Sequence, residues 1–249
     1  MKQWLHLPGW HWVVNVRLIM PWAGLCLAIA LFMPPSAQAG EGGFSNYFAG
    51  AYGSILPAIA PEPGFTFVSQ NYYFSGSVSE TVLNGRVEAN VESVAYFSYF
   101  TGVYTWDLPD WGGRFAVVAA VPIAYTDVSA ERTGPGPGGS DSGNTLGSAD
   151  SGWVPASYFW SSGNWHFNTY LSVVAPTGYY DVNDIASLGR NHWSFDTVFA
   201  TTYFDAERGF EISVVPGYFI NTKNHETDYR SGNEFHVDWM VNKLFENGW

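Results

Sequence analysis

The chain has 249 residues, of which 22 are Asp or Glu and 10 are Lys or Arg, so its formal net charge is −12 at pH 7. Only 13% of the residues are charged and 18% are aromatic, a composition that argues against a disordered chain. The acidic balance argues against a protein that binds nucleic acid, which needs a basic face. Many aromatic residues with few charges suit a protein whose outer surface faces something other than water.

The N-terminus has the layout of a secretory signal peptide. Two basic residues are followed by an apolar run over residues 18–33, and residues 37–39 read A-Q-A, which fits an A-x-A cleavage site. We expect the signal peptide to cover residues 1–39, with cleavage after Ala39. The alternative at this stage is an N-terminal membrane anchor.

The expected mature domain covers residues 40–249, with residues 40–64 as an N-terminal extension. Cys26 is the only cysteine and lies in the segment expected to be removed. We therefore expect a mature domain without a disulfide or a thiolate metal site. No second apolar stretch is long enough to predict a transmembrane helix.

Strand-forming sequence fills the mature domain. Runs rich in Tyr, Phe, Trp, Val and Thr are separated by clusters of Gly, Asn, Asp and Ser. Apolar and polar residues alternate with a period of two along several runs, which indicates a sheet that is polar on one side only. The expected strands cover residues 65–78, 86–106, 114–127, 153–161, 164–175, 193–205, 209–221 and 234–245.

The expected connections alternate between short and long. Short ones lie near 107–113, 161–164, 205–209 and 246–248, and longer ones near 79–85, 128–152, 176–192 and 222–233. This alternation, with aromatic residues beside the short turns, is typical of an outer-membrane barrel with interfacial aromatic girdles. We predict an all-β fold, an antiparallel up-and-down transmembrane β-barrel of which about eight strands are visible.

Residues 128–152 are rich in Gly, Ser, Pro and Asp and show no apolar period. We expect them to form a mobile outer loop that cannot pack a core. Asp141 and Asp150 could suggest calcium ligands, but their spacing fits no known calcium loop. A solvated loop is the preferred interpretation.

The mature sequence contains no recognisable catalytic or cofactor motif. A nucleophile elbow, a P-loop, a zinc-protease motif and a dinucleotide-binding fingerprint are all missing from it. His225, Glu226, Asp228 and His236 are close enough in sequence to make a metal site conceivable. Polar roles in loops and lumen are preferred, so we expect no catalytic, cofactor-binding or metal-ligating residues.

Polar residues on the face away from lipid are the candidate functional residues. A charge is costly on the lipid side of a membrane barrel and is tolerated in the lumen. Such residues either solvate a wet interior or line a permeation path. Those expected in the lumen or at its mouth are Arg86, Glu88, Glu92, Asp181, Arg190, Asp196, Glu211, Asp228, Arg230, His236 and Asp238.

The two long connections 176–192 and 222–233 each contain an arginine among several acids. We expect Arg190 and Arg230 to bridge acids across these connections and to narrow the entrance. The alternative is that each arginine satisfies its own connection. Exposed ion pairs are weak individually, so several would be needed to hold a lid.

Four segments of the second half carry a family resemblance: APTGYYD at 175–181, LGRNHWSFD at 188–196, GYFINTKN at 217–224 and TDYRSGNEFH at 227–236. With them, and with its opening segment 42–65, the chain resembles the family named for the meta pathway of phenol degradation, also called SphA-like proteins. The resemblance implies an outer-membrane β-barrel of a family often encoded near enzymes of aromatic catabolism.

The implied function is a porin-like channel for passive uptake of small hydrophobic or aromatic compounds. Its expected partners are outer-membrane lipid, the solute and the barrel-assembly machinery, and its expected location is the bacterial outer membrane. Family members usually continue beyond the residue that matches Gly248. We therefore expect a C-terminally truncated sequence; the alternative is a natural eight-stranded end.

Two other functions stay open from the sequence. An outer-membrane barrel enzyme acting on lipids would need a nucleophile and a base at the outer rim, for which Ser231 and His225 are candidates without a supporting motif. A secreted lipocalin-like binder of small molecules is the second alternative. Our expectation is a channel with no enzymatic activity and no cofactor.

Overall fold

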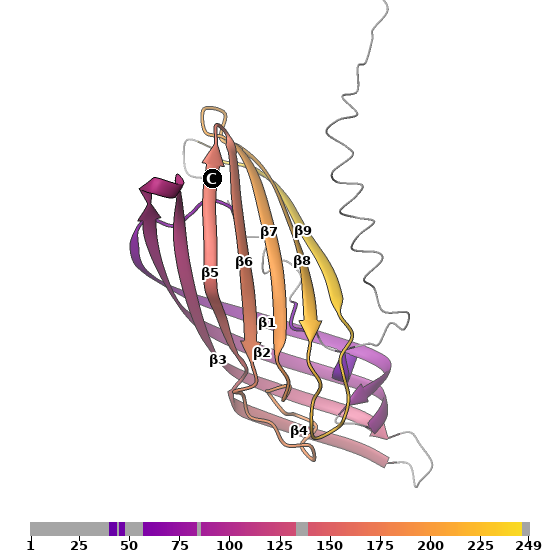
Figure 1. Cartoon of the computed structure of the whole chain (residues 1–249). Coiled ribbons are helices and arrows are strands. Elements are labelled where there is room, and N and C mark those ends of the chain that lie inside the picture. The colour runs from indigo at the N-terminus through magenta and orange to yellow at the C-terminus, as the bar shows by residue number, and fades with distance from the viewer. Residues whose placement is uncertain (1–39, 44, 48–56, 84–85, 133–138, 246–249) are drawn as a thin grey trace, which may run out of the picture. The chain divides into compact units, whose positions relative to one another are not determined.

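The computed structural model describes residues 40–43, 45–47, 57–83, 86–132 and 139–245. The expected signal peptide, its cleavage point after Ala39 and the short connection 246–248 lie outside these residues. Within them, no helix has the length and apolar character needed to cross a membrane. They form one antiparallel sheet of nine strands with two short 3-10 helices (Figure 1).

Strands that follow one another in the chain are neighbours in the sheet, except β4 and β5, which both pair with β3. The elements are η2 (Glu41–Gly43), β1 (Gly64–Leu83), β2 (Arg86–Leu108), η3 (Pro109–Trp111), β3 (Gly113–Arg132), β4 (Gly139–Ser148), β5 (Ser151–Ser162), β6 (Trp165–Ala175), β7 (Ser194–Asp205), β8 (Phe210–Asn221) and β9 (Glu234–Lys243). The sheet order is β1-β2-β3-β5-β6-β7-β8-β9, and β4 pairs with β3. The predicted all-β, up-and-down antiparallel fold is confirmed, and all eight expected strands are present.

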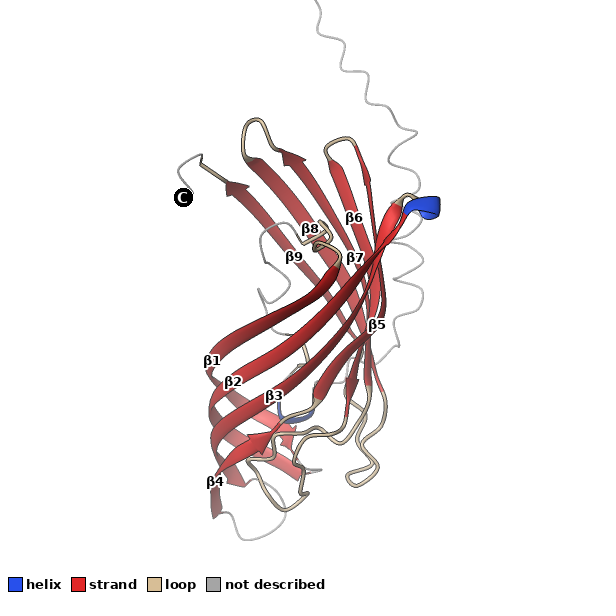
Figure 2. Ribbon diagram, turned by 90° about the vertical axis from the view of Figure 1, so that its left-hand side faces the viewer, coloured by secondary structure: helices blue, strands red, loops and turns tan. Residues whose placement is uncertain are grey.

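The sheet is curled into a half-barrel (Figure 2). In the described part of the chain, no hydrogen-bonded ladder joins β1 to β9. The short connections that follow β2, β5 and β7 define what we call the turn end of the sheet. The connections that follow β6 and β8 define the loop end.

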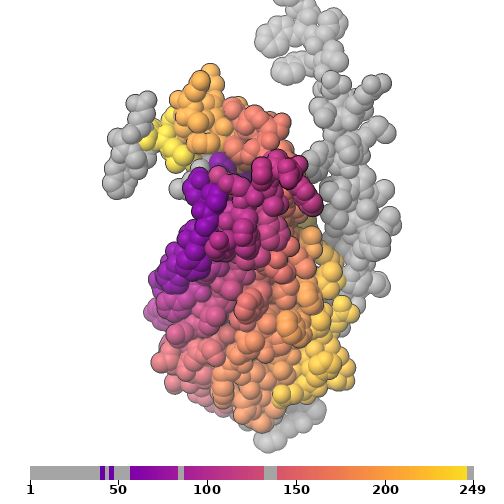
Figure 3. Space-filling model, turned by 60° about the vertical axis from the view of Figure 1, so that its left-hand side comes forward, coloured from indigo at the N-terminus to yellow at the C-terminus, as the bar shows by residue number. Residues whose placement is uncertain are grey.

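The two faces of the sheet have opposite chemistry, with polar side chains on the buried one. In β8, Glu211 and Ser213 are fully buried, whereas Ile212 and Val214 are 42% and 41% exposed. We call the side of Glu211 and Ser213 the concave face and the other side the convex face, part of which is seen in Figure 3. An apolar outer surface around a polar interior is the arrangement of a barrel in lipid.

Aromatic pairs on neighbouring strands lie near the turn end. Trp160 stacks on Phe167 with ring centroids 5.2 Å apart, and Trp165 contacts Tyr203 at 5.1 Å. Such cross-strand aromatic pairs stabilise antiparallel strands beyond their burial of area. Aromatic residues that the sequence suggests for an interfacial girdle therefore also stabilise the pairing of β5, β6 and β7.

The expectation of a long connection at residues 79–85 is wrong. β1 continues to Leu83, which pairs with Arg86 at the start of β2. The intervening dipeptide in the sequence is Asn-Gly, the strongest short signal of a two-residue hairpin. In this part of β1, polar residues occupy both faces of the strand. The sequence therefore lacks the alternation of apolar and polar residues by which strands were predicted.

The segment 128–152, expected to be a mobile loop, is mostly strand. β3 runs on to Arg132, and β4 pairs with it along its whole length. A Cβ added to Gly143 would lie 3.4 Å from Ala186, and one added to Gly147 would lie 3.4 Å from Leu188. The small residues of β4 thus form a close-packed surface for the connection between β6 and β7. Composition alone does not distinguish such a surface from a flexible linker.

Glu88 and Glu92, expected on one polar face, lie on opposite faces. A β-bulge interrupts the ladder between Ala89 and Glu92, and Asn90 there has a φ of 47°. The extra residue reverses the alternation beyond it. As a result Glu88 and Val91 are buried and Glu92 is exposed. Asparagine tolerates this left-handed conformation, but a period of two carries no signal for the bulge.

Candidate functional site

The concave face is covered in part by the chain's own N-terminal segment, a name we use for the described residues 41–43, 45–47 and 57–62. Ala58 in this segment is buried in the main apolar cluster, whose other members are Val198, Ala200, Val215 and Met240. Its backbone N–H donates to Thr202 Oγ1 at 3.3 Å. Sequence reasoning identified residues 40–64 as an extension but had no signal for its position.

A central polar cluster lies on the concave face of β7 and β9. His236 Nε2 is 3.1 Å from both carboxylate oxygens of Asp196, and both side chains are almost completely buried. Tyr47 of the N-terminal segment stacks on the His236 ring with centroids 4.5 Å apart. The Tyr47 hydroxyl donates to Asp238 Oδ1 at 2.7 Å. Three residues expected in the lumen are thus brought together, and Tyr47 is the partner that sequence reasoning missed.

Gly217 makes the contact between Asp196 and His236 possible. These two residues lie on strands that flank β8, and Gly217 is paired with Val198 on one side and with His236 on the other. A Cβ at position 217 would lie 2.2 Å from His236 Nε2 and 2.9 Å from Asp196 Oδ1. The missing side chain on the middle strand therefore leaves the space in which the outer two side chains meet.

A second buried network surrounds Glu211 nearer the turn end. Ser213 Oγ donates to Glu211 Oε1 at 2.6 Å, and Asn242 Nδ2 donates to Oε2 at 2.9 Å. Thr202 Oγ1 is 2.8 Å from Ser213 Oγ. The carboxylate of Glu211 is fully buried, and its hydrogen bonds offset part of the free energy of desolvation.

Arg190 lies at the loop end and contacts the N-terminal segment. Its Nη1 donates to the Glu41 carbonyl and its Nη2 to the Ser45 carbonyl, each at 3.3 Å. Burial lowers the pKa of Arg190, and the nearby carboxylates of Asp150, Glu234 and Glu41 oppose this by favouring the charged form. The two hydrogen bonds described here hold the N-terminal segment. The expectation that Arg190 bridges acids from one long connection to the other stays a prediction.

Arg230 contacts its own connection. Its Nε donates to the Asn221 carbonyl at 3.0 Å, which agrees with the alternative interpretation for this residue. Asp228 forms an exposed ion pair with Lys223 at 2.8 Å, and the hydrogen bond and charge of Lys223 lower the pKa of Asp228. Asp181 accepts the backbone N–H of Asn183 at 2.8 Å. These side chains therefore stabilise the structure of their own connections.

Amide side chains join the two long connections. Asn191 Nδ2 donates to Asn224 Oδ1 at 3.0 Å, and Asn224 Nδ2 donates to Tyr180 Oη at 2.9 Å and to Glu41 Oε2 at 3.2 Å. Asn224 is fully buried, so it links both connections to the N-terminal segment. The available sequence signal was its place in the GYFINTKN motif at 217–224.

Asp150 anchors the connection between β6 and β7. Its Oδ1 accepts the backbone N–H of Gly178 at 2.9 Å, and its Oδ2 accepts that of Arg190 at 2.8 Å. Sequence reasoning weighed a calcium ligand at this residue and preferred a residue of a solvated loop. The structure places it between β4 and β5, where it holds both ends of the connection.

Replacing Asp150 by Ala is expected to lower the free energy of unfolding by about 1–3 kcal/mol, because two part-buried N–H donors lose their acceptor. Limited proteolysis should cut within 176–193 faster than in the parent protein. The control is Asp110→Ala in the exposed turn before β3, for which we expect a change within about 0.5 kcal/mol. Equal urea unfolding curves for the two variants would contradict the anchoring role.

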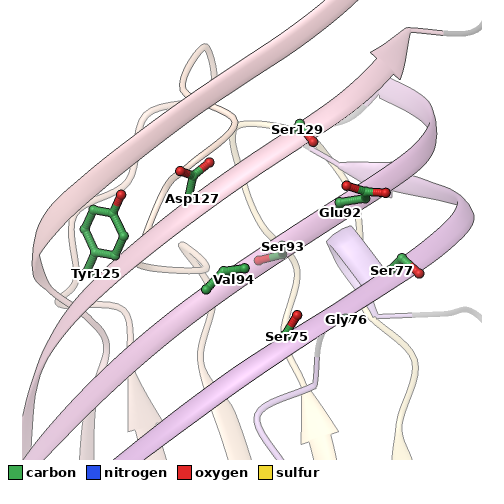
Figure 4. Close-up of a pocket in the computed structure, with 9 residues that line it drawn as sticks. All are labelled: Ser75, Gly76, Ser77, Glu92, Ser93, Val94, Tyr125, Asp127 and Ser129. Atoms are coloured by element: carbon green, nitrogen blue, oxygen red, sulfur yellow. The ribbon is translucent and has the colours of Figure 1, made fainter.

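The remaining candidates are dispersed. Glu88 is buried on the concave face at the far end of β2, and the Arg86 side chain lies outside the described residues. Glu92 lines a shallow depression on the convex face of β1–β3 (Figure 4), together with Ser75, Gly76, Ser77, Ser93, Val94, Tyr125, Asp127 and Ser129. Among the described residues, no three His, Cys, Asp or Glu side chains are grouped as metal ligands.

Two comparisons with known proteins give matches. A sequence model of the family described as "Putative MetA-pathway of phenol degradation" matches residues 74–249. The fold is similar to the crystal structure of the COG4313 outer membrane channel from Pseudomonas putida F1, with a TM-score of 0.53 and 18% identity over 74% of this chain and 68% of that chain. No curated protein matches the sequence.

Proposed function

Because this chain belongs to the family of the MetA pathway of phenol degradation, we propose that it is a porin-like channel for passive uptake of small hydrophobic or aromatic compounds. We further propose that it is exported after cleavage following Ala39 and inserted into outer-membrane lipid by the barrel-assembly machinery. The structural neighbour is an outer membrane channel by its description, which supports this proposal.

The distribution of polar and apolar side chains carries the proposal. Trp239 on the convex face of β9 is 73% exposed, whereas its neighbour Asp238 is 9% exposed on the concave face. Apolar groups that face water raise the free energy of a soluble protein, whereas the same groups in lipid do not. A polar interior combined with an apolar exterior therefore favours a barrel wall over a secreted lipocalin-like binder.

The alternative of a lipid-acting enzyme finds little support in the geometry. Ser231, its candidate nucleophile, is buried and accepts the backbone N–H of Glu41 at 3.1 Å. His225, its candidate base, is exposed. A nucleophile in such an enzyme needs a base within hydrogen-bond reach and access for its substrate.

The test begins with fractionation of cells that express the chain. We expect it in the outer membrane, with a band that shifts on heating in gel electrophoresis. A deletion strain should then grow slowly on low concentrations of an aromatic carbon source and recover with the restored gene, whereas growth on succinate serves as the control. Recovery of the chain in the soluble periplasm, or equal growth of both strains on every aromatic substrate, would contradict the proposal.

A further inference from the structure

The N-terminal segment contacts the concave face at points from the loop end to the turn end. At the loop end it is held by Arg190, as described above, and by Ser231, whose Oγ accepts the Glu41 N–H. At the turn end, Arg114 near the start of β3 donates to the Pro61 carbonyl at 2.9 Å and to Glu62 at 3.2 Å. The described parts of the segment therefore contact the interior at both ends of the sheet.

Between these ends the segment is fastened to the polar groups of β7 and β9. Asn46 Nδ2 donates to Ser194 Oγ at 2.7 Å, and Tyr47 contacts both His236 and Asp238. Ala58 continues this line of contacts within the apolar cluster. The polar face of the sheet is consequently covered along much of its length by protein.

The contacts described above use side chains of the sheet and of its connections, and the described residues of the segment contain no β-strand. A segment attached in this way is a separate element within the barrel wall, because it can leave without breaking a strand ladder. Local elements with few backbone hydrogen bonds to their neighbours open at lower free energy than the sheet itself.

We propose that the N-terminal segment is an internal plug that restricts passage through the channel, and that Arg190 is the residue that anchors it at the loop end. This inference rests on the proposed function. Arg190 is suited to the role because its planar guanidinium reaches two carbonyls of the segment, those of Glu41 and Ser45, which a lysine ammonium cannot do with the same geometry. The plug narrows the lumen for every solute, so it determines the largest size of solute that can pass.

The first experiment measures whether Arg190 holds the segment, and it does not depend on channel activity. Ala58→Cys is introduced into the full chain in lipid vesicles and is labelled with a maleimide reagent; Ala58 is 1% exposed, so labelling should be slow. Adding Arg190→Ala should raise the labelling rate about tenfold or more, because labelling follows local opening. Arg208→Ala, which removes the ion pair between an exposed arginine and Asp205 in a short turn, is the control and should leave the rate unchanged.

A second variant tests the same attachment independently, in case Arg190→Ala does not fold. Tyr47→Phe keeps the ring that stacks on His236 and removes only the hydroxyl bond to Asp238. It should increase labelling of Ala58→Cys by a smaller factor, while heating still shifts the band on gels. If neither variant labels faster than the parent, the segment is not anchored by these contacts and the proposal is overturned.

The second experiment measures whether the segment restricts passage. Arg190→Ala should increase single-channel conductance and the largest solute that enters liposomes. A disulfide between Ala58→Cys and Val215→Cys, which belong to one cluster, should return both quantities to parent values, and reduction should raise them again. If conductance stays high with the disulfide closed, the plug is located elsewhere. If the parent chain passes no solute at all, the proposed function fails, and the labelling result still decides the anchoring by Arg190.

Discussion

Replacing Gly217 by Ala is expected to lower the free energy of unfolding by about 3 kcal/mol or more, because a buried charged group that loses a hydrogen-bond partner costs more than the roughly 1–3 kcal/mol of a neutral one. The added methyl group would lie 2.2 Å from His236 Nε2 and 2.9 Å from Asp196 Oδ1. The imidazole must move, and the fully buried carboxylate of Asp196 then loses it as a partner. Equilibrium urea unfolding in lipid vesicles measures the change.

Two comparisons separate this mechanism from a general intolerance of glycine replacement. Gly152→Ala in β5 is the matched control, because its Cβ would meet only the Ala120 Cβ at 3.8 Å, an ordinary contact; we expect a change within about 1 kcal/mol. In an Asp196→Asn background, Gly217→Ala should be less destabilising, because coupled residues are not additive. Additive changes in the double variant would show that Gly217 acts independently of the pair.

The inward face of β7–β9 could be predicted because strand alternation is a local property. Glu211, His236 and Asp238 each stand between apolar neighbours in sequence, and Asp196 follows Phe195. A period of two places such residues on one side of the sheet. The structure buries all four on the concave face. The same reasoning failed at Glu88 and Glu92, where one bulge at Asn90 exchanges the two faces of the strand. The alternation of residues in the sequence does not reveal this bulge.

The partners of these residues could not be predicted because they come from distant parts of the chain. Glu41 and Asn224 are 183 residues apart in sequence, and Tyr47 and Asp238 are 191 apart. No local pattern reports which segment fills the interior of a sheet. The contact of Arg190 with the N-terminal segment could not be predicted for the same reason: its acidic neighbours in sequence suggested an ion pair, and nothing in the sequence indicates that folding brings two backbone carbonyls to its guanidinium.

The largest effect on membrane insertion is expected from a charge on the convex face. Leu171→Arg in β6 should make folding into a bilayer less favourable by about 2–4 kcal/mol if this position is near the midplane. Leu171 is 39% exposed on that face, so the arginine would project into lipid. Ser213, an inward residue, is unsuitable as a control because it is fully buried and bonded to Glu211.

Ser172→Arg is the matched control, one residue further along the same strand. Ser172 is only partly buried and pairs across the ladder with Asp196, so the new guanidinium would face a carboxylate on the concave side instead of hydrocarbon. Opposite charges directly across two strands attract, and we expect a change of less than about 1 kcal/mol. Refolding into vesicles with a urea titration measures both variants. If they prove equally destabilised, or if Leu171→Arg resembles the parent, then the convex face does not meet lipid, and the assignment of inside and outside must be reversed or abandoned.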